Sequence, residues 1–497
     1  GAVHGAGRLL RECRWGKGYL EMEETDISSY PQKPLRGDHL GYSRNNNAYN
    51  LWDMETYGQY VKELALFGAS AIEFSFEDES KKDNDPDRKC DPFKMMLHIT
   101  GLTRTLGMQV WVKVSTSWLN ETGIPIPRKG YVDETSPSAA EMNDFLRTDE
   151  DRRINTFSKI GHIDHIFIPG GDPGRLNARD LFAFSERVAA ILHRYHPNAG
   201  VWISPQIVSS GEKFTREFYE EVARRPAWLT GIVHGPWSRE TMAQCREHIP
   251  ADLPIRSFPD ICHMLCSQYP VHQMDPVWAV TAGRECYNPR PRWHKRMHDL
   301  TAPFNIGNIP YTEGIADDVA KYLWLDFDWS ESITPAKTLR DFASMFISPD
   351  HADELELASL IAGFEDIFEG PAVTNGAVSQ VYNGLKALER TLESEEYMPG
   401  FGADSYRFKT PRLMSAFYAY IQQKAIRDAG AMQKAWSELG AGGSFEEIAG
   451  RIREDLEIVE KSPNAALLDE IWRLADECFD RIKWKVSTSR HLSPNYA

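Results

Sequence analysis

Several features that would assign a function class are missing from the sequence. No run of 18 or more apolar residues occurs, so no transmembrane helix is predicted. The seven cysteines form no Cys-x-x-Cys pair, and the single cluster Cys262-His263-x-x-Cys266 has no second half-site. The Gly-x-Gly-x-x-Gly fingerprint of dinucleotide-binding folds is also absent. We therefore expect no metal site and no cofactor.

Basic residues are in deficit. The 56 Lys and Arg residues face 72 Asp and Glu residues, which gives a formal net charge of -16. A surface that binds phosphate backbones needs an excess of Lys and Arg, so no nucleic-acid partner is expected. The remaining composition, 42% hydrophobic and 26% charged, is ordinary for a globular protein, and 497 residues suffice for two or three domains.

Short apolar runs alternate with amphipathic stretches from about residue 35. Eight runs read as strands: 35–42, 70–76, 108–114, 164–170, 201–207, 230–237, 254–260 and 305–314. Stretches with helical period lie between them, at 53–68, 92–107, 177–197 and 212–225, and Asp53 is the expected N-cap of the first. Eight strand–helix units predict a parallel (β/α)8 TIM barrel of the α/β class, with a doubly wound sheet as second choice.

Strand signals stop after about residue 331. Segments 337–345, 353–368, 376–394, 411–438, 445–461 and 465–485 read as helices. We therefore expect a catalytic barrel at 30–330 and a mainly α-helical C-terminal domain at 331–497. Residues 1–29 would be the tail end of an upstream α/β domain and a linker. The chain begins at Gly1 rather than methionine, which indicates a processed fragment. The localisation is left open, with export to the periplasm or secretion favoured.

In a (β/α)8 barrel the carboxyl ends of the strands carry the chemistry. Here these ends are rich in carboxylates, imidazoles and aromatic side chains: His39, Tyr42, Glu73, Lys113, Asp172, His234, Trp237, Asp260, His263 and Glu313. Aromatic faces stack on sugar rings, polar side chains bind hydroxyl groups, and two carboxyl groups flank a scissile glycosidic bond. The mixture predicts an oligosaccharide or glycoside as the partner.

Most of these candidates also have a structural interpretation. Glu73 and Lys113 lie inside apolar runs and can pair across the barrel interior as an ion pair. Trp237 can cap the barrel rim, His234 can be a satisfied core histidine, and Asp260 can cap the following helix.

Asp172 and Glu313 are harder to explain structurally. Each ends a strand beside glycine, where small neighbours let another group approach closely. In the stretch 163-IDHIFIPGGDPG-174, we interpret Gly170 and Gly171 as room for a sugar at the strand end, with Asp172 projecting into the site. We expect both carboxylates in the site.

Four short motifs resemble known glycoside hydrolases. The stretch 168-IPGGD-172 resembles the strand-four motif of family-20 β-hexosaminidases, and 1-GAVHGAGRLLRE-12 is similar to the end of the domain that precedes the barrel in that family and in family-67 α-glucuronidases. The stretches 283-GRECYNPR-290 and 260-DICHMLCSQYPV-271 resemble segments of the α-glucuronidases, which also carry a helical C-terminal domain. The resemblance implies a barrel-type glycosidase, with Arg284, Asn288 and Arg290 among its substrate-binding residues.

One departure from the hexosaminidase motif matters for mechanism. Pro173 stands where that family has its acid glutamate, and proline cannot donate a proton. Of the family's pair only the aspartate matches, at Asp172, where the resemblance implies a role in orienting the substrate's acetamido group. A hexosaminidase-like enzyme would therefore need a rearranged acid.

The leading hypothesis is a glycoside hydrolase that removes a terminal sugar. A uronate or other anionic sugar would find cationic partners among Arg36, His39, Lys113, His234, His263, Arg284 and Arg290. The alternatives are a carbohydrate-binding barrel without catalysis, a hexosaminidase-like enzyme with a rearranged acid, and a lyase or isomerase with Lys113 as base. The oligomeric state is left open, and a homo-oligomer is compatible with the sequence.

For hydrolysis we choose Glu313 and Asp172 as the catalytic carboxyl groups, with Asp260 in reserve. Glu313 stands between Thr312 and Gly314 in a polar, open setting at a strand end. A separation of roughly 5 Å between the two carboxyl groups would favour a retaining reaction, and roughly 6.5–9.5 Å an inverting one with a water molecule between them.

Overall fold

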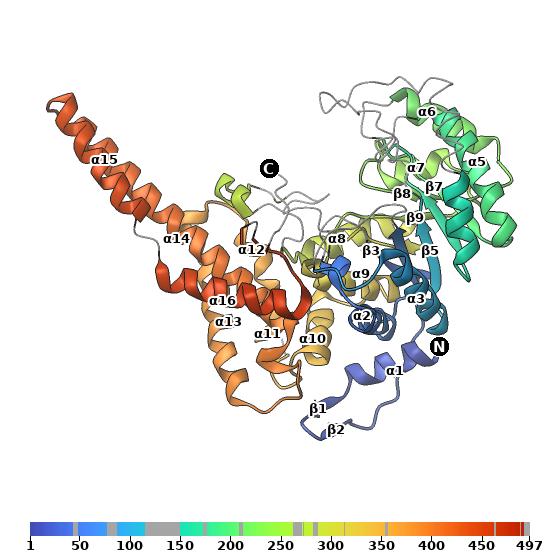
Figure 1. Ribbon diagram of the computed structural model, residues 1–497, viewed down its shortest axis with the longest axis horizontal. Helices are drawn as coiled ribbons and strands as arrows, with labels where there is room; N and C mark the ends of the chain where they lie inside the picture. Colours follow the sequence, from blue (N-terminus) through green and yellow to red (C-terminus); the bar gives the residue numbers. More distant parts are fainter. Residues whose placement is uncertain are drawn as a thin grey trace. The chain divides into compact units, whose positions relative to one another are not determined.

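The fold is taken from a computed structural model of the chain (Figure 1). The structure describes residues 1–42, 48–76, 87–114, 150–171, 176–207, 212–261, 271, 273–281, 287–312, 314–352, 356–461, 464–487 and 489–491. Within these ranges no helix is both long and apolar enough to cross a membrane.

Eight parallel strands close into a barrel in the order β10-β3-β4-β5-β6-β7-β8-β9. The strands are β3 (Leu35–Tyr42), β4 (Ala71–Phe76), β5 (Gln109–Lys113), β6 (His165–Ile168), β7 (Gly200–Ile203), β8 (Leu229–His234), β9 (Ile255–Ser257) and β10 (Gly307–Asn308). Each lies inside or within one residue of one of the eight predicted runs, so the (β/α)8 barrel prediction is confirmed.

Helices follow the strands around the barrel. They are α2 (Met54–Leu66), α3 (Pro92–Thr105), an unlabelled helix at 150–159, α5 (Ala178–Tyr195), α6 (Glu212–Ala223), α7 (Met242–His248), α8 (Pro291–Thr301) and α9 (Asp318–Trp329). The Asp53 side chain accepts the backbone N–H of Thr56, so it is the predicted N-cap. Gly68, at φ +113°, follows the helix in a conformation that other residues rarely adopt.

The remaining elements are mainly helical. They are α10 (Pro335–Phe346), α11 (Leu357–Ala362), α12 (Phe364–Ile367), α13 (Gly376–Ser394), α14 (Tyr406–Gly440), α15 (Phe445–Lys461) and α16 (Ala465–Ile482). A helix α1 (Ala2–Arg11) and a hairpin of β1 (Arg14–Gly16) and β2 (Tyr19–Glu21) open the chain. The predicted helical C-terminal region is therefore confirmed.

The chain divides into two compact units that are not identical to the predicted domains. One unit contains the barrel and consists of Gly1–Leu10, Thr25–His263 and Trp293–Thr334. The other consists of Arg11–Glu24, Met264–Arg292 and Pro335–Ala497. The division at Thr334/Pro335 lies four residues beyond the expected boundary. The segment Met264–Arg292, which follows barrel strand β9, groups with the helices instead.

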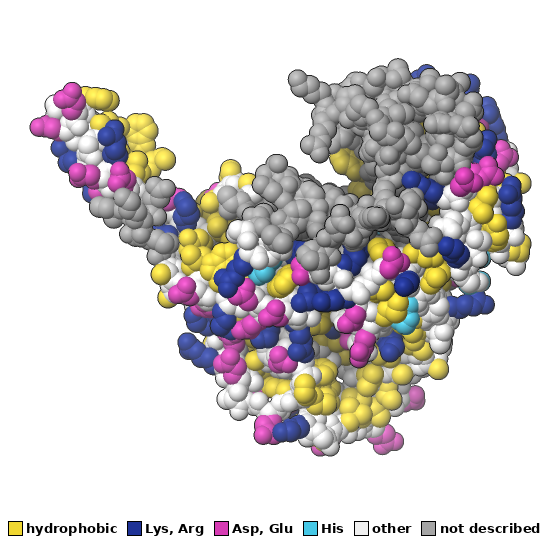
Figure 2. Space-filling model, in the orientation of Figure 1, with side chains coloured by type: hydrophobic (Ala, Val, Ile, Leu, Met, Phe, Trp, Pro, Cys, Tyr) yellow, Lys and Arg dark blue, Asp and Glu magenta, His cyan; other side chains and the backbone are white. Residues whose placement is uncertain are grey.

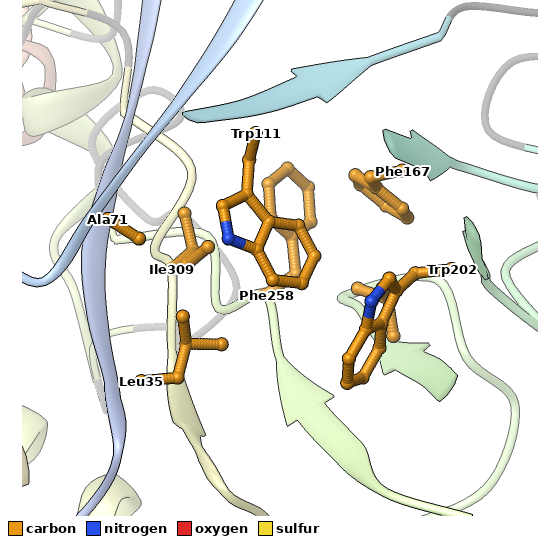
Figure 3. Close-up of a cluster of buried hydrophobic side chains, with 8 residues drawn as sticks. Leu35, Ala71, Trp111, Phe167, Trp202, Phe258 and Ile309 are labelled. Atoms are coloured by element: carbon orange, nitrogen blue, oxygen red, sulfur yellow. The ribbon is translucent and has the colours of Figure 1, made fainter. Parts of the chain in front are cut away.

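The barrel interior is filled by one apolar side chain from each strand or its immediate carboxyl flank. These are Leu35, Ala71, Trp111, Phe167, Trp202, Val233, Phe258 and Ile309, all buried (Figure 3). Successive side chains of a strand point to opposite faces, so the residues two positions further on also point inward. On β4 and β5 the inward residues two positions beyond Ala71 and Trp111 are Glu73 and Lys113. On the adjacent strand β3, the inward residue four positions beyond Leu35 is His39. A polar layer therefore covers the apolar one toward the carboxyl ends.

His165 packs among the aromatic residues of this core. Its Nδ1 accepts the indole N–H of Trp202 at 3.2 Å, and its ring lies 4.3 Å from the Trp111 ring, centroid to centroid. An Nδ1 that accepts a hydrogen bond carries no proton, so this contact requires the neutral imidazole. Burial lowers the pKa of His165 from 6.5 to about 4.

This histidine should make the barrel sensitive to acid. Because its folded pKa lies below its unfolded one, its contribution is complete above about pH 6.5 and is lost as the pH falls toward 4, by up to about 3 kcal/mol. His165→Asn keeps an acceptor for Trp202 and should flatten the dependence of unfolding free energy on pH in this window. Urea unfolding at stepped pH measures it. His98→Asn, at an exposed site, is the control, and equal slopes in all three proteins would contradict the prediction.

Candidate active site at the carboxyl ends of the barrel strands

Gly170 and Gly171 bring the ends of β6 and β7 together. Gly170 has φ +73°, and a Cβ there would lie 2.3 Å from the backbone oxygen of Ser204. The N–H of Gly171 donates to the Gln206 carbonyl at 2.7 Å, in a parallel bridge to Ile207. Gly170 is thus required by the approach of a neighbouring backbone, and Gly171 lies close to the same backbone, a reason that the sugar-based interpretation did not include. This pairing sets the position from which the chain continues to Asp172.

A buried ion pair crosses the barrel below the site. Arg256, one residue into β9, donates through Nη2 to Oε2 of Glu73 on β4, and both side chains are fully buried. The guanidinium lies 4.6 Å from the Trp111 ring centroid and 4.7 Å from that of Phe167. Among the described residues its Nε and Nη1 have no hydrogen-bond acceptor, so these aromatic faces are their environment.

The other carboxylate oxygen of Glu73 orients His39. Nδ1 of His39 donates to Glu73 Oε1 at 2.9 Å, and Nε2 lies 3.1 Å from the hydroxyl of Ser75. Glu73 and His39 are buried, whereas Ser75 is partly exposed. The carboxylate fixes the imidazole tautomer, and the imidazole in turn holds the hydroxyl group of Ser75 at the carboxyl end of β4.

Charge compensation keeps this network in one protonation state. Burial opposes ionisation of Glu73, but the charge of Arg256 and the hydrogen bond from His39 outweigh it and lower the pKa of Glu73. Burial lowers the pKa of His39 despite its bond to Glu73. Burial also lowers the pKa of Arg256, to about 10. Near neutral pH the network therefore holds an anion, a cation and a neutral imidazole.

Lys113 ends β5 beside Ser75, its register partner on β4. Its ammonium lies 5.1 Å from the Phe258 ring centroid and 5.2 Å from that of Tyr311. Within the described part of the chain it forms no ion pair with Glu73, so the predicted pairing of these two residues is replaced by the Glu73–Arg256 pair. The Lys113 ammonium remains a positive charge at the carboxyl end of the barrel, bordered by aromatic rings.

Trp237 is exposed at the carboxyl end of β8, where a backbone contact fixes its position. Its N–H donates to Oε1 of buried Gln206 at 3.3 Å, and its carbonyl accepts the N–H of Ile207 at 3.1 Å. The side chain is 45% exposed, which leaves an aromatic face for a ligand. By contrast, His234 donates Nε2–H to the Glu240 carbonyl at 2.9 Å, and burial lowers the pKa of His234. These contacts are those of a core histidine, the structural alternative for this residue.

Asp260 lies at the carboxyl end of the barrel and Arg36 at the opposite end. Asp260 is buried and pairs with Tyr311 in a parallel bridge that extends β9 alongside β10. Arg36 is the second residue of β3, and its guanidinium donates to the carbonyls of Gly68 and Lys33 at 2.9 and 2.7 Å. Arg36 is therefore not among the residues that the structure brings together at the strand ends.

The other predicted site residues lie in the helical unit, are described only as backbone, or lie outside the described residues. Asn288 and Arg290 are buried in the helical unit, and Tyr42 is described only as backbone at the end of β3. Four candidates lie outside the described residues: Asp172, His263, Arg284 and Glu313.

Sequence reasoning missed Arg256, Ser75 and Tyr311. Arg256 stands two residues before Phe258 and four before Asp260, so period-2 alternation would have placed all three side chains inside the barrel. That signal could have identified Arg256 as the partner of Glu73. No sequence signal connects Ser75 with His39, because their contact depends on the register of two strands.

No protein-family model matches the chain, and no curated protein matches its sequence. A family 89 glycoside hydrolase from Clostridium perfringens, in complex with its substrate GlcNAc-α-1,4-galactose, is similar in structure, with a TM-score of 0.50 and 12% identity over 92% of this chain and 58% of that chain. A second structure described as a family 89 glycoside hydrolase from that organism, in complex with PUGNAc, gives a TM-score of 0.51, 10% identity and the same coverage.

This chain therefore spans 58% of the length of these two structures. At such identities the likeness shows the fold alone. It supports the barrel fold that the sequence motifs implied, and it leaves the resemblance to families 20 and 67 as a prediction.

The buried ion pair should be strongly coupled. Glu73→Gln and Arg256→Met should each lower the free energy of unfolding by about 3–5 kcal/mol, because each leaves the partner charge buried and alone. The double variant should lose less than the sum of the two. Urea unfolding followed by tryptophan fluorescence measures all three. The exposed pair Arg225–Asp252 is the matched control, where Arg225→Met and Asp252→Asn should cause much smaller losses. Strictly additive losses at Glu73 and Arg256 would contradict the prediction.

Proposed function

We propose that this chain is a glycoside hydrolase that removes a terminal sugar at the carboxyl end of the barrel. One observation carries the proposal. The closed barrel brings to the same end three strands whose continuations contain the candidate acids, with Asp172 directly after Gly171, Asp260 paired with Tyr311, and Glu313 two residues after Tyr311. The shared fold with family 89 glycoside hydrolases is consistent with this assignment.

Strand order favours Asp172 and Glu313 as the catalytic pair. Asp172 follows β6 and Glu313 follows β10, and these strands are four positions apart in either direction around the barrel. Carboxyl groups that follow opposite strands can approach a sugar from opposite sides, as glycosidic hydrolysis requires. One would protonate the leaving oxygen, and the other would attack the anomeric carbon or activate water.

Asp260 has a different relation to the pair. It follows β9, the neighbour of β10. A carboxyl group beside a like-charged one favours the protonated form of one of them, which is the state that a general acid needs. Asp260 is thus the reserve partner of Glu313, and its presence supports an arrangement in which one acid stays protonated.

Lys113 favours an anionic sugar, such as a uronate. Its ammonium lies over two aromatic rings at the mouth and has no carboxylate partner among the described residues. An anionic substituent would supply a counter-charge to this ammonium, while Trp237 offers a face for a sugar ring. The GlcNAc-containing substrate in the similar structure supports a neutral N-acetyl sugar as the competing possibility.

Removing either proposed catalytic carboxyl group should strongly reduce turnover without unfolding the protein. Asp172→Asn and Glu313→Gln keep the side-chain shape, and each should reduce kcat at least about a hundredfold, the usual scale for a lost acid or base. Chromogenic glycosides and natural oligosaccharides are the substrates, and NMR of the product anomer separates retention from inversion. Asp252→Asn, an exposed site, is the control.

Three results would decide against this assignment. If Asp260→Asn is inactive while Asp172→Asn and Glu313→Gln are near normal, the catalytic pair is wrong. If the unmodified protein binds oligosaccharides but hydrolyses none, the chain is a carbohydrate-binding barrel instead. An unsaturated product that absorbs in the ultraviolet would indicate a lyase.

Lys113 should determine the charge preference. Lys113→Met keeps much of the apolar stem but removes the ammonium, and it should raise KM for a uronate glycoside at least about tenfold while leaving a neutral analogue nearly unchanged. The control is Lys159→Met, because the Lys159 ammonium also lies over a ring, that of Phe93 at 4.9 Å, but on helices rather than at strand ends. Equal losses on both substrates would show that Lys113 is structural.

A further inference from the structure

The outer half of α14 and the whole of α15 form a helical hairpin that extends from the helical unit (Figure 1). The first part of α14 packs against α13 and α16 and is largely buried as far as Gln422. Beyond Gln422 only Ala431 of this helix is buried. Of the α15 side chains that are described, only Ile448 is buried. The hairpin thus extends beyond the core of its own unit.

Large apolar side chains are exposed along this hairpin. Met432 is 60% exposed, Trp436 69% and Phe445 80%, and hydrophobic side chains gather along the hairpin in Figure 2. A groove of about 680 Å³ runs along it, lined mainly by apolar residues of α14 with Ile452 and Leu456 of α15. A second groove of about 400 Å³ is lined mainly by apolar residues of α15 and by Leu439.

Two helices alone cannot bury these side chains. Apolar residues of α14 that line the groove recur every three or four positions, at Ala431, Met432, Ala435, Trp436 and Leu439. This is the pattern of a helix that faces other helices. Bundles bury such stripes by adding a third or fourth helix. The described residues supply no third helix along this stripe, and another helical hairpin of the same length would fit.

The charges of the hairpin favour a second copy of this chain. The inner end of the exposed part of α14, residues 424–428, contains Lys424, Arg427 and Asp428, so its net charge is 2 − 1 = +1. The tip, residues 438–447, contains Glu438, Glu446 and Glu447 and no basic residue, so its net charge is -3. An antiparallel pair of hairpins places each acidic tip against a basic inner end. A parallel pair would place like charges together.

The register of such a pair follows from the same residues. If Ala431 of both copies lies at the twofold axis, Lys424 faces residue 438 of the other copy, because both are seven positions from the axis. The span from 424 to 438 is about 21 Å along the helix. Trp436 then lies near Arg427 of the other copy, a favourable cation–π contact. The small side chains of Ala431 and Ala435 let the helices approach closely.

We propose that this hairpin, residues 424–461, is a dimerisation surface on which two copies of the chain pack antiparallel as a four-helix bundle. The interface is isologous, because the same residues serve both copies. The acidic tip disfavours an anionic membrane surface as the alternative partner, since Glu446 and Glu447 flank the exposed Phe445. This inference does not depend on the enzymatic activity of the barrel.

The test is the mass of the whole chain in solution over a range of concentrations, by sedimentation equilibrium. The unmodified protein should be a dimer. Trp436→Glu should raise the dissociation constant at least about thirtyfold, the scale of a central tryptophan in an interface. Ile426→Glu is the matched control, because Ile426 is 47% exposed on the same helix but lines neither groove. It should remain dimeric, and circular dichroism should show all variants folded.

Charge exchange tests the orientation. Within one copy Lys424 pairs with Asp428 and Glu438 with Arg451, so circular dichroism must show that the hairpin stays folded in each variant. Lys424→Glu should weaken the dimer, and adding Glu438→Lys should restore it, because the two positions face each other in opposite copies. A protein that is monomeric at all concentrations, or a dimer unaffected by Trp436→Glu, would overturn the proposal. So would sedimentation of a monomeric protein with anionic phosphatidylserine vesicles that Trp436→Glu abolishes, since that result would assign the surface to a membrane.

Discussion

The ion pair between Glu73 and Arg256 is the constraint on which the upper half of the barrel depends. Both groups are fully buried, so neither charge can remain without the other. The pair joins β4 to β9, two strands that are three positions apart in the closed sheet. Below it lies the apolar layer of Trp111 and Phe167, whose faces enclose the guanidinium. The pair therefore connects the hydrophobic core with the polar mouth, and Phe258 of the core contacts both Arg256 and Lys113.

The side chains above the pair take their positions from it. Glu73 uses its second oxygen to hold His39, and His39 holds the hydroxyl of Ser75. Because Arg256 already satisfies Glu73, the nearby Lys113 is left to its contacts with Phe258 and Tyr311. The carboxylate–imidazole–hydroxyl chain has the connectivity of a nucleophilic triad, but its acid is paired with arginine and its imidazole is buried. We interpret it as a device that orients Ser75 toward the mouth.

The sequence was sufficient for the barrel because strand and helix periods are local. The eight runs, the N-cap Asp53 and the limits of α13 and α15 depend on neighbours in the chain. The site was harder to predict because it depends on which end of a strand a residue occupies and on what faces it. Arg36 was expected at the mouth but begins β3, where backbone carbonyls bind it. The structural alternative for Glu73 was a pair with Lys113, although the alternation that places Arg256 inside was visible in the sequence.

Closure of the sheet adds the relation that a linear sequence does not contain. Strands β6 and β10 are separated by more than 130 residues, yet their places in the strand order are opposite each other. A barrel conserves this relation at 12% identity with another chain, because it requires alternating apolar side chains and not particular ones. The fold can therefore be shared while the residues at the strand ends differ. For that reason the assignment of Asp172 and Glu313 rests on strand order together with their own chemistry, and not on likeness to any other protein.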